Sequence, residues 1–325
     1  MLRFVRNDKE RLGQLMQEII NKYMDYLKVG RNASPYTIRT YYNSLMGNNT
    51  RGSQKGFFPF LYMNKVDSLD KVNKQILRDY IMWLMDQKVA KTSITCKLSA
   101  IRSFYVYLQK EGLIQENPME KISSPKLDRR LPSYLTNDEI NRFLLAPDVS
   151  TPTGQRDKAI LELLYASGLR VSELAHLTRG QIDMDTREIR VLGKGSKERL
   201  VLMGKPAENA ITVYLKEGRH KLQGKKKTEA VFINRYGQQL IERRIQKIVK
   251  QYAKQSGINK KVHPHTIRHT FATHLLDGGA DLRVVQELLG HASLTTTQIY
   301  THVSKSQAKK VYHAAHPLAR EATND

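Results

Sequence analysis

Apolar side chains recur every three or four positions over residues 9 to 28, which is the spacing of an amphipathic helix. The positions that carry this pattern are Leu12, Leu15, Met16, Ile19, Ile20, Tyr23, Tyr26 and Leu27. Ser34 followed by Pro35 is typical of an N-cap with proline at the first helical position. The pair predicts a second helix that continues to about Leu45. The chain therefore opens with two helices.

Two further segments with helical spacing follow in the same half of the chain. They predict helices from about 73 to 87 and from 92 to 111, and Gly112 ends the second one. The stretch GNNTRGSQKG, from 47 to 56, predicts a flexible loop. Because this half contains four predicted helices and no convincing strand, we predict an all-α unit.

The helical pattern lapses from 117 to 135. Three prolines, paired serines and clustered basic residues indicate an extended linker there. We place the domain boundary near Arg130, so the chain is predicted to consist of an N-terminal helical domain, residues 1–128, and a second domain, residues 129–325.

The second domain is predicted to be mixed α/β, mostly helical with a small antiparallel sheet. Thr136 and Glu139 form a capping-box pattern that begins its first helix. Strands at 188 to 192 and 199 to 203 flank GKGSKE, a glycine-bearing hairpin turn. Further helices are predicted near 156 to 166, 206 to 219, 241 to 256, 264 to 276, 281 to 289 and 295 to 300. The whole chain is thus predicted to be mainly α.

The predicted helix 241 to 256 has one basic face. Its basic residues at helical spacing are Arg243, Arg244, Lys247 and Lys250, and its apolar residues on the opposite face are Ile241, Ile245, Ile248 and Val249. This arrangement suits a helix laid against DNA, but an ordinary exposed helix has the same pattern.

Charge indicates the kind of partner. The chain has 325 residues, enough for two domains, and its 54 Lys and Arg against 31 Asp and Glu give a net charge of +23 and a pI near 9.9. Neutralising phosphates and releasing their counterions would supply much of the affinity for a nucleic acid. A membrane surface is the rival partner. The mean hydropathy of −0.52 and the lack of a long apolar run or basic amphipathic anchor disfavour it.

The first residues and the cysteine count indicate the compartment. The start, MLRFVRNDKE, lacks the apolar core of a secretion signal, so we expect a cytoplasmic protein. Cys96 is the only cysteine, which excludes a disulfide framework or a cysteine-based zinc site within one chain. A reducing compartment fits both observations.

Candidate chemistry is concentrated in the second domain. All 10 histidines follow residue 175, and six of them lie between 263 and 302. Four short segments stand out there, namely GLRVSEL at 168 to 174, GKGSKER at 193 to 199, HTIRH at 265 to 269, and LGH at 289 to 291 with Tyr300 following.

These segments suit an attack on a phosphodiester. The two-donor guanidinium groups of Arg170 and Arg268 match the non-bridging oxygens that gather negative charge. A tyrosine with a pKa of about 10 needs help to lose its proton, and His265 is the candidate base for Tyr300. Lys194, on the hairpin, can give a proton to the departing 5′ oxygen.

The last candidate of this set is His291, which can donate a hydrogen bond to the phosphate in the transition state. The scheme requires no metal. His263, His269 and His274 beside His265 raise the possibility of a metal site, but no carboxylate or thiolate cluster completes it, and a nearby arginine would repel a cation. Tyr300 is one of 16 tyrosines, and in isolation a structural role would be the better interpretation.

The same segments resemble the motifs of the tyrosine recombinases, the phage integrase family, most of all the bacterial Xer recombinases. The matching motifs are GLRVSEL, GKGSKERL, HPHTIRHTFATHLL and LLGHASLTTTQIYTHV. The likeness extends into SPYTIRTYYNSL, LSAIRSFYVYL and NPMEKISSPKLDRRLP, so it covers nearly the whole chain. Residue by residue, the resemblance assigns catalytic roles to Arg170, Lys194, His265, Arg268, His291 and the nucleophile Tyr300.

The resemblance also implies an architecture and a task. Residues 1–128 would be a SAM-like core-binding domain that embraces double-stranded DNA together with the catalytic domain, 129–325. Four protomers, alike or paired with a related recombinase, would act on two DNA sites, each docking a tail like residues 304–325 on a neighbour. Strands would be cleaved and rejoined through a 3′-phosphotyrosine. Because that ester preserves the energy of the phosphodiester, no ATP, metal or other cofactor is needed.

The family implies chromosome dimer resolution at a dif-like site, with an FtsK-type DNA translocase as a regulator. Three alternatives remain open, namely a mobile-element integrase of the same family, a type IB topoisomerase and a non-catalytic DNA-binding protein. The loop 47 to 56 is longer than expected for a Xer protein, which keeps the mobile-element alternative open. The intact set of six candidate residues argues against a non-catalytic protein.

Overall fold

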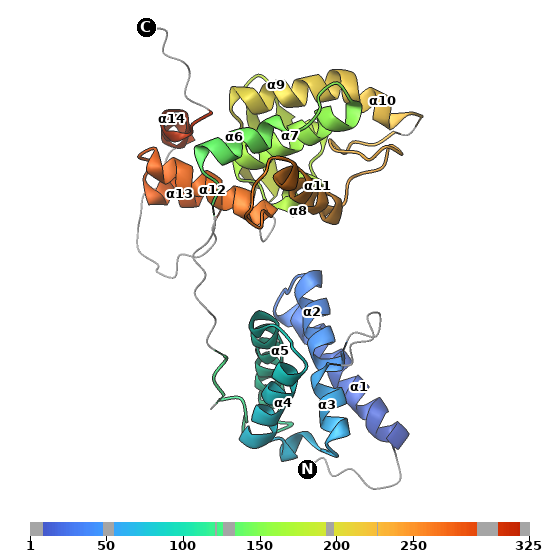
Figure 1. Ribbon diagram of the computed structural model, residues 1–325. Helices are drawn as coiled ribbons and strands as arrows, with labels where there is room; N and C mark the ends of the chain where they lie inside the picture. The colour runs from blue at the N-terminus through green and yellow to red at the C-terminus, as the bar shows by residue number, and fades with distance from the viewer. Residues whose placement is uncertain are drawn as a thin grey trace. The chain divides into compact units, whose positions relative to one another are not determined.

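The computed structural model describes residues 9–47, 55–120, 122–125, 134–192, 198–225, 227–290 and 305–318. The chain divides into two compact units, Met1–Arg130 and Leu131–Asp325 (Figure 1). No helix among the described residues is both long and apolar enough to cross a bilayer.

All the regular secondary structure among the described residues of the first unit is helical. It consists of α1 (Lys9–Asp25), which continues as a π-helical turn (Tyr26–Gly30), then α2 (Pro35–Met46), α3 (Phe57–Met63), a 3-10 turn (Leu69–Lys71), α4 (Lys74–Asp86) and α5 (Lys91–Lys110). Helix α5 packs against α2 and α4. Aromatic rings fill the core between them, with Phe57 and Tyr80 centred 5.3 Å apart. The predicted all-α unit is confirmed for these residues.

The capping signals placed most helix boundaries of this unit correctly. The Ser34 hydroxyl accepts a hydrogen bond from the Thr37 amide at 3.1 Å, as an N-cap does. Helix α3 was missed. Its sequence FFPFLYM is a continuous apolar run without helical spacing, and Pro59 fits because it lies in the first turn. Residues 48–54 of the predicted loop lie outside the described residues.

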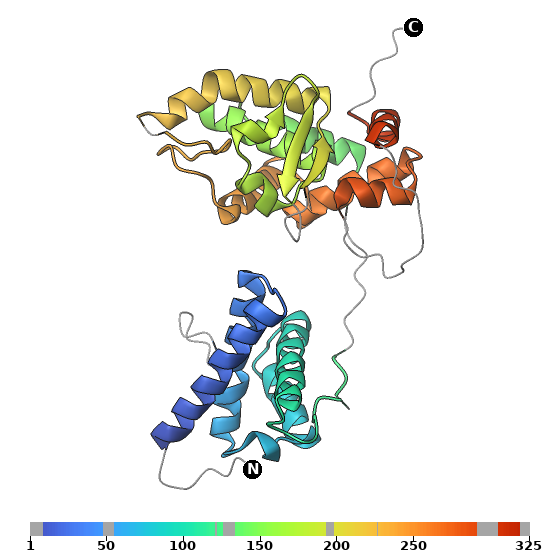
Figure 2. The same cartoon turned by 180° about the vertical axis from the view of Figure 1, so that it is seen from behind.

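The second unit contains most of the helices and the only described sheet. Its helices are α6 (Asn137–Leu145), α7 (Pro152–Ser167), α8 (Val171–Ala175), α9 (Lys205–Val213), α10 (Arg219–Gln223), α11 (Glu242–Gln255), α12 (Pro264–Asp277), α13 (Leu282–Leu289) and α14 (Lys305–Ala315), with a π-helical turn at Tyr214–Gly218 and a 3-10 turn at Arg179–Gln181. Strands β1 (Ile182–Asp183), β2 (Glu188–Leu192) and β3 (Glu198–Leu202) form an antiparallel sheet in that order (Figure 2). The predicted fold class is confirmed.

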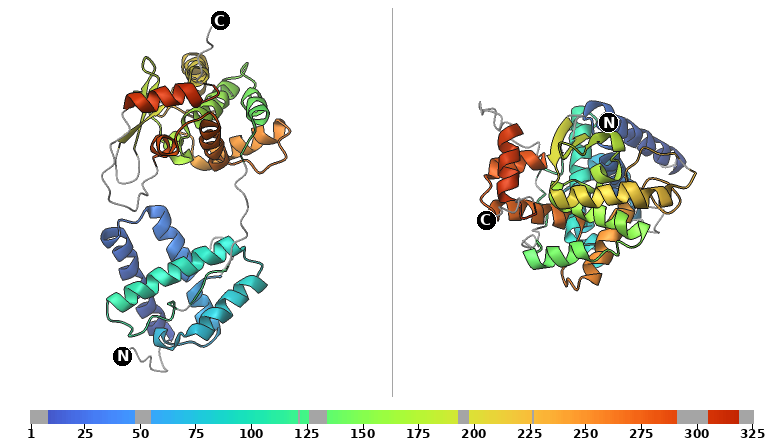
Figure 3. Two further views of the ribbon diagram at one scale, coloured as in Figure 1. Left: turned by 90° about the vertical axis from the view of Figure 1, so that its left-hand side faces the viewer. Right: turned by 90° about the horizontal axis from the view of Figure 1, so that it is seen from above.

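Helix α7 lies at the centre of this unit and positions the site. Almost all of its side chains are buried, and it packs against α6, α9, α11 and α12 (Figures 1 and 3). It ends at Gly168, whose φ of +58° is left-handed. A Cβ there would lie 2.7 Å from the Phe271 ring, so only glycine allows this close turn. The turn places Arg170 directly before α8, as the N-cap residue of that helix.

Several predictions for this unit can be judged directly. The Thr136–Glu139 capping box and the strand pair are present, whereas α8 and β1 were not predicted. The predicted helix 295 to 300 lies outside the described residues. The placement of Ile241 was wrong, because it is the N-cap of α11 and is 67% exposed, while the other three apolar positions of that helix are buried.

Candidate active site

Arg170 is the N-terminal cap of α8 and is held at three points. Its backbone amide donates to Glu173 Oε2 at 2.7 Å, and its Nη1 donates to Glu173 Oε1 at 2.9 Å. Its Nη2 donates to the carbonyl oxygen of Gly290, at the end of α13, at 3.1 Å. The side chain is still 35% exposed. The guanidinium is therefore oriented by the protein and open to a ligand.

Arg268, on α12, is buried near Arg170. Its Nη1 donates to the carbonyl of Gly168 at 2.6 Å, and its Nη2 donates to the carbonyl of Leu289. Burial, with the positive charge of Arg170 as a second cause, lowers the pKa of Arg268 to about 10. The group still carries its charge at neutral pH. The structure thus brings Arg170 and Arg268 to the same pair of chain segments, the α7–α8 turn and the end of α13.

Glu173 holds the site together, and our sequence reasoning did not single it out. Both of its oxygens accept hydrogen bonds from Arg170 and also from Arg199, whose Nη1 and Nη2 lie at 2.7 and 2.9 Å. Burial would raise the pKa of Glu173, but the hydrogen bonds from Arg199 and Arg170 outweigh it and hold the pKa below its usual value. Its position three residues after Arg170, at the N3 position of α8, was the available signal.

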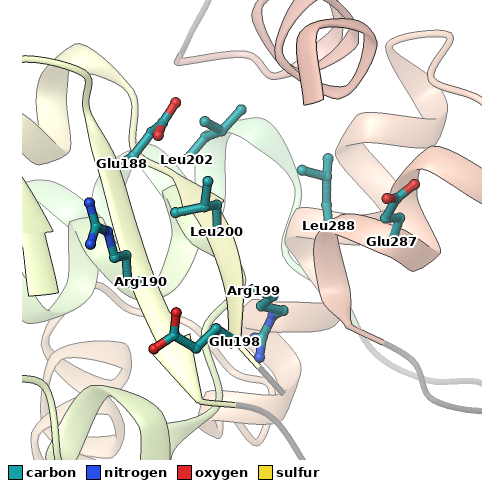
Figure 4. A pocket seen from close by; sticks show the side chains of 8 residues that line it. All are labelled: Glu188, Arg190, Glu198, Arg199, Leu200, Leu202, Glu287 and Leu288. Atoms are coloured by element: carbon teal, nitrogen blue, oxygen red, sulfur yellow. The ribbon is translucent and has the colours of Figure 1, made fainter. Parts of the chain in front are cut away.

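Arg199 is the second residue of the site that our sequence reasoning missed. It lies on β3 and lines a groove between the β2–β3 hairpin and α13, together with Leu200 and Leu288 (Figure 4). The side chain is 14% exposed. Its position five residues after Lys194, on the strand that leaves the predicted hairpin turn, places it near that candidate in the sequence.

Of the other four predicted site residues, His265 is the one that the structure describes. His265 is exposed in the first turn of α12, three residues before Arg268 and hence on the same side of that helix. Lys194, His291 and Tyr300 lie outside the described residues. Gly290, the residue before His291, is the one whose carbonyl accepts from Arg170.

The remaining histidines of α12 pack in the structure. His274 is buried with its Nδ1 at 2.8 Å from the Tyr165 hydroxyl, and burial lowers the pKa of this imidazole. The His269 ring is centred 6.4 Å from the Tyr134 ring. Both histidines therefore lie against tyrosine rings. Within the ranges described, no group of three or more His, Cys, Asp or Glu side chains is arranged to hold a metal ion.

The basic face of α11 is accessible. Arg243, Arg244, Lys247 and Lys250 are all exposed, and Ile245 and Val249 anchor the opposite face in the core. The helix packs against α8, which begins at Arg170. A cationic surface therefore adjoins the element that carries the arginine site.

Comparison with known proteins agrees with this geometry. Residues 133–307 match the phage integrase family, and residues 20–112 match the N-terminal SAM-like domain of phage integrases. The chain belongs to the phage integrase family of tyrosine recombinases. These enzymes cleave and rejoin DNA, and the chain is therefore a DNA recombinase in class.

The similarity to curated relatives extends over nearly the whole chain. It is 44% identical over 309 residues to the tyrosine recombinase XerC of Thermodesulfovibrio yellowstonii, covering 94% of this chain and 98% of the relative. It is 39% identical over 304 residues to the tyrosine recombinase XerD of Staphylococcus epidermidis, covering 94% and 100%.

Solved structures share the fold. The XerH site-specific recombinase, bound to a palindromic difH substrate in a post-cleavage complex, matches with a TM-score of 0.65 at 24% identity, covering 90% of this chain and 84% of that one. The Tn1549 transposon integrase, in complex with transposon right end DNA, matches with a TM-score of 0.66 at 19% identity, covering 90% and 97%.

Proposed function

We propose that the chain is a site-specific recombinase of the Xer type, with Arg170, Lys194, His265, Arg268, His291 and Tyr300 as its catalytic residues. One observation carries this proposal most directly. The guanidinium groups of Arg170 and Arg268 donate to neighbouring carbonyls at the end of α13, those of Gly290 and Leu289, and His291 is the next residue in the sequence. Two fixed cations at one place suit a phosphodiester in its transition state.

In the proposed reaction, the Tyr300 oxygen attacks the scissile phosphorus while His265 accepts its proton. The bond to the 5′ oxygen breaks, and that oxygen takes a proton from Lys194. The product is a 3′-phosphotyrosine and a free 5′ hydroxyl. Arg170, Arg268 and a hydrogen bond from His291 stabilise the charge on the phosphate oxygens. The 5′ hydroxyl of the partner duplex then attacks the phosphotyrosine, so resealing needs neither ATP nor a metal.

The proposed biological task is chromosome dimer resolution at a dif-like site in the cytoplasm. Identity of 39% to 44% along the full length of XerC and XerD relatives supports it. In this proposal residues 1–128 are the core-binding domain and 129–325 the catalytic domain. Four protomers, alike or paired with a related recombinase, act on two sites under an FtsK-type translocase. The exposed cations of α11 suit the DNA backbone.

Covalent trapping tests both the chemistry and the task. The protein is incubated with fragmented genomic DNA of its host, denatured to stop the reaction, and the DNA attached to protein is sequenced. We expect a single palindromic locus near the replication terminus. Recovery of element ends would instead identify a mobile-element integrase.

A matched variant tests the nucleophile. Tyr300→Phe removes only the attacking oxygen, so covalent adducts should disappear on a denaturing gel while the affinity for DNA is nearly unchanged. Adducts that persist in this variant would show that another residue is the nucleophile.

A further inference from the structure

We propose that Arg199 is a positioning residue of the recombination reaction. It ties the paired strands β2 and β3, between which Lys194 lies in the sequence, to Arg170 by way of Glu173. The inference rests on the proposed function, because it concerns the same catalytic residues. Arg199 itself is assigned no contact with the phosphate.

The first support is the geometry of the ion pair. Arg199 meets Glu173 with two nitrogens on two oxygens, at 2.7 and 2.9 Å. The two side chains are only 14% and 7% exposed. A two-pronged pair with little access to water is directional and much less screened than a surface pair. Because both terminal nitrogens of Arg199 face this carboxylate, it fixes the orientation of Glu173.

The second support is a close approach to Gly290. A Cβ on Gly290 would lie 2.8 Å from Cδ and 2.9 Å from Nε of Arg199. The stem of Arg199 therefore packs directly on the glycine whose carbonyl accepts from Arg170. Arg199 contacts both groups that hold Arg170, one through a carboxylate and one through packing.

The third support is the charge of the cluster. Arg170, Arg199 and Arg268 carry three positive charges, and Glu173 carries one negative charge because its pKa is lowered. Since Arg199 can balance Glu173, Arg170 and Arg268 together keep two positive charges for a phosphate. Without Arg199, the buried carboxylate would be balanced by Arg170 alone, and the site would keep only one. Removing Arg199 should therefore weaken transition-state stabilisation.

The test compares three variants on a nicked duplex that carries the site recovered by covalent trapping. Arg199→Met keeps an apolar stem against Gly290 and removes the charge. Single-turnover cleavage should fall about 100-fold, as for a misplaced catalytic group. Affinity for the uncleaved duplex should be nearly unchanged, and the protein should stay folded at the assay temperature with a modestly lower thermal midpoint, because Arg170 still pairs with the buried Glu173. Arg199→Lys should recover part of the rate, because it restores the charge and not the two-pronged geometry. Arg190→Met, at an exposed position on β2 of the same hairpin, is the matched control and should cleave normally.

A double-mutant cycle separates positioning from general damage. If Arg199 acts through Glu173, the variant with both Glu173→Gln and Arg199→Met should cleave no more slowly than the slower single variant, because an amide at position 173 no longer cancels the charge of Arg170. Normal cleavage by Arg199→Met, fully additive losses, or a rate loss matched by lost folding or lost DNA affinity would each overturn the inference. A parent protein that forms no adduct with any DNA would instead refute the proposed function, and this inference with it.

Discussion

Arg170 and Arg268, the two arginines proposed to bind the phosphate, have different hydrogen-bond partners. This difference determines how each should respond to mutation. Arg170 is paired with a carboxylate, whereas Arg268 donates hydrogen bonds to the carbonyl oxygens of Gly168 and Leu289. A carbonyl orients a guanidinium without cancelling its charge. Arg268 therefore brings nearly a full positive charge to the site, at the cost of burying it.

Arg268→Ala and Arg268→Lys should both impair catalysis strongly. Loss of the guanidinium should lower single-turnover cleavage by about 100- to 1000-fold, the range for a lost transition-state donor. Lysine should not restore the rate, because its single nitrogen lacks the planar fork whose separate nitrogens reach the two carbonyls and leave further donors for a phosphate. Cleavage of a nicked duplex at saturating protein measures this effect, with Lys216→Ala, an exposed cation in the turn Tyr214–Gly218, as the control. Near-normal cleavage by Arg268→Ala would exclude a catalytic role.

Motif residues could be predicted from the sequence, but their supports could not. Arg170 and Arg268 stood out by type and order. Glu173 and Arg199 are 26 residues apart and come from a helix and a strand, so a single sequence contains no sign that they form a pair. Sequence reasoning thus singled out the arginines proposed to meet the substrate and missed Glu173, which pairs with Arg170, and Arg199, which pairs with Glu173.

At the scale of elements, local chemistry predicted several boundaries well, but it missed the Thr151 cap and placed the start of α7 near 156 instead of at Pro152. Ser34, Thr136 and Gly168 each mark a helix end where expected. Where tertiary packing decided, prediction failed. Helix α3 is a short apolar run that is helical within an aromatic core, and Ile241 is exposed because α11 begins one residue later.

Helix α14 shows the same limit, because its sequence resembles a docking tail but does not say where it docks. In this chain it packs on α12 and α13. Tyr312 is fully buried, and its hydroxyl donates to the carbonyl of Ala166 at 2.9 Å. His316 is also fully buried, among the rings of Tyr165, Phe271 and Tyr312. The contacts that seat this helix are therefore aromatic and come from α7 and α12.

Docking of α14 should weaken as the pH falls. Burial, with the nearby His274 as a further cause, lowers the pKa of His316 to about 3, against about 6.5 in an unfolded chain. Below pH 6.5 the His316 imidazole binds a proton when the segment is released, whereas the docked imidazole stays neutral. The free energy of undocking should therefore decrease by about 1.4 kcal/mol per pH unit down to the folded pKa. His274, whose pKa is also lowered, acts in the same direction where it is exposed by the same opening.

Hydrogen exchange of peptides from α14, corrected for the intrinsic rate at each pH, measures this effect between pH 7 and 5. Protection in the parent should fall about tenfold per pH unit below the unfolded pKa. His316→Phe, which keeps a ring in the aromatic cluster, should show a shallower pH dependence. Equal slopes in the two proteins would mean that His316 does not control docking.

At the scale of the whole molecule, charge and motifs predicted the enzyme class, while the two-unit architecture rested on composition alone. The net charge of +23 indicated a polyanionic binding partner, and the family comparison identifies DNA as the substrate class. Which part of that charge meets DNA depends on where the cations lie after folding. Lys216 and Lys221 are exposed like the cations of α11. They belong to other elements, the π-helical turn Tyr214–Gly218 and α10, which both pack against α7 (Figures 1 and 2).

If the basic face of α11 lies along DNA, its cations should appear in the salt dependence of binding. Each phosphate contact adds about 0.9 to the slope of log Kd against log salt concentration. Arg243→Ala combined with Lys247→Ala should therefore lower that slope by about two, whatever the base sequence. The pair Lys216→Ala and Lys221→Ala removes the same charge from exposed positions outside α11 and should leave the slope nearly unchanged. Fluorescence anisotropy over a salt series distinguishes these results. Equal losses from the two pairs would mean that net charge, rather than the face of α11, determines DNA binding.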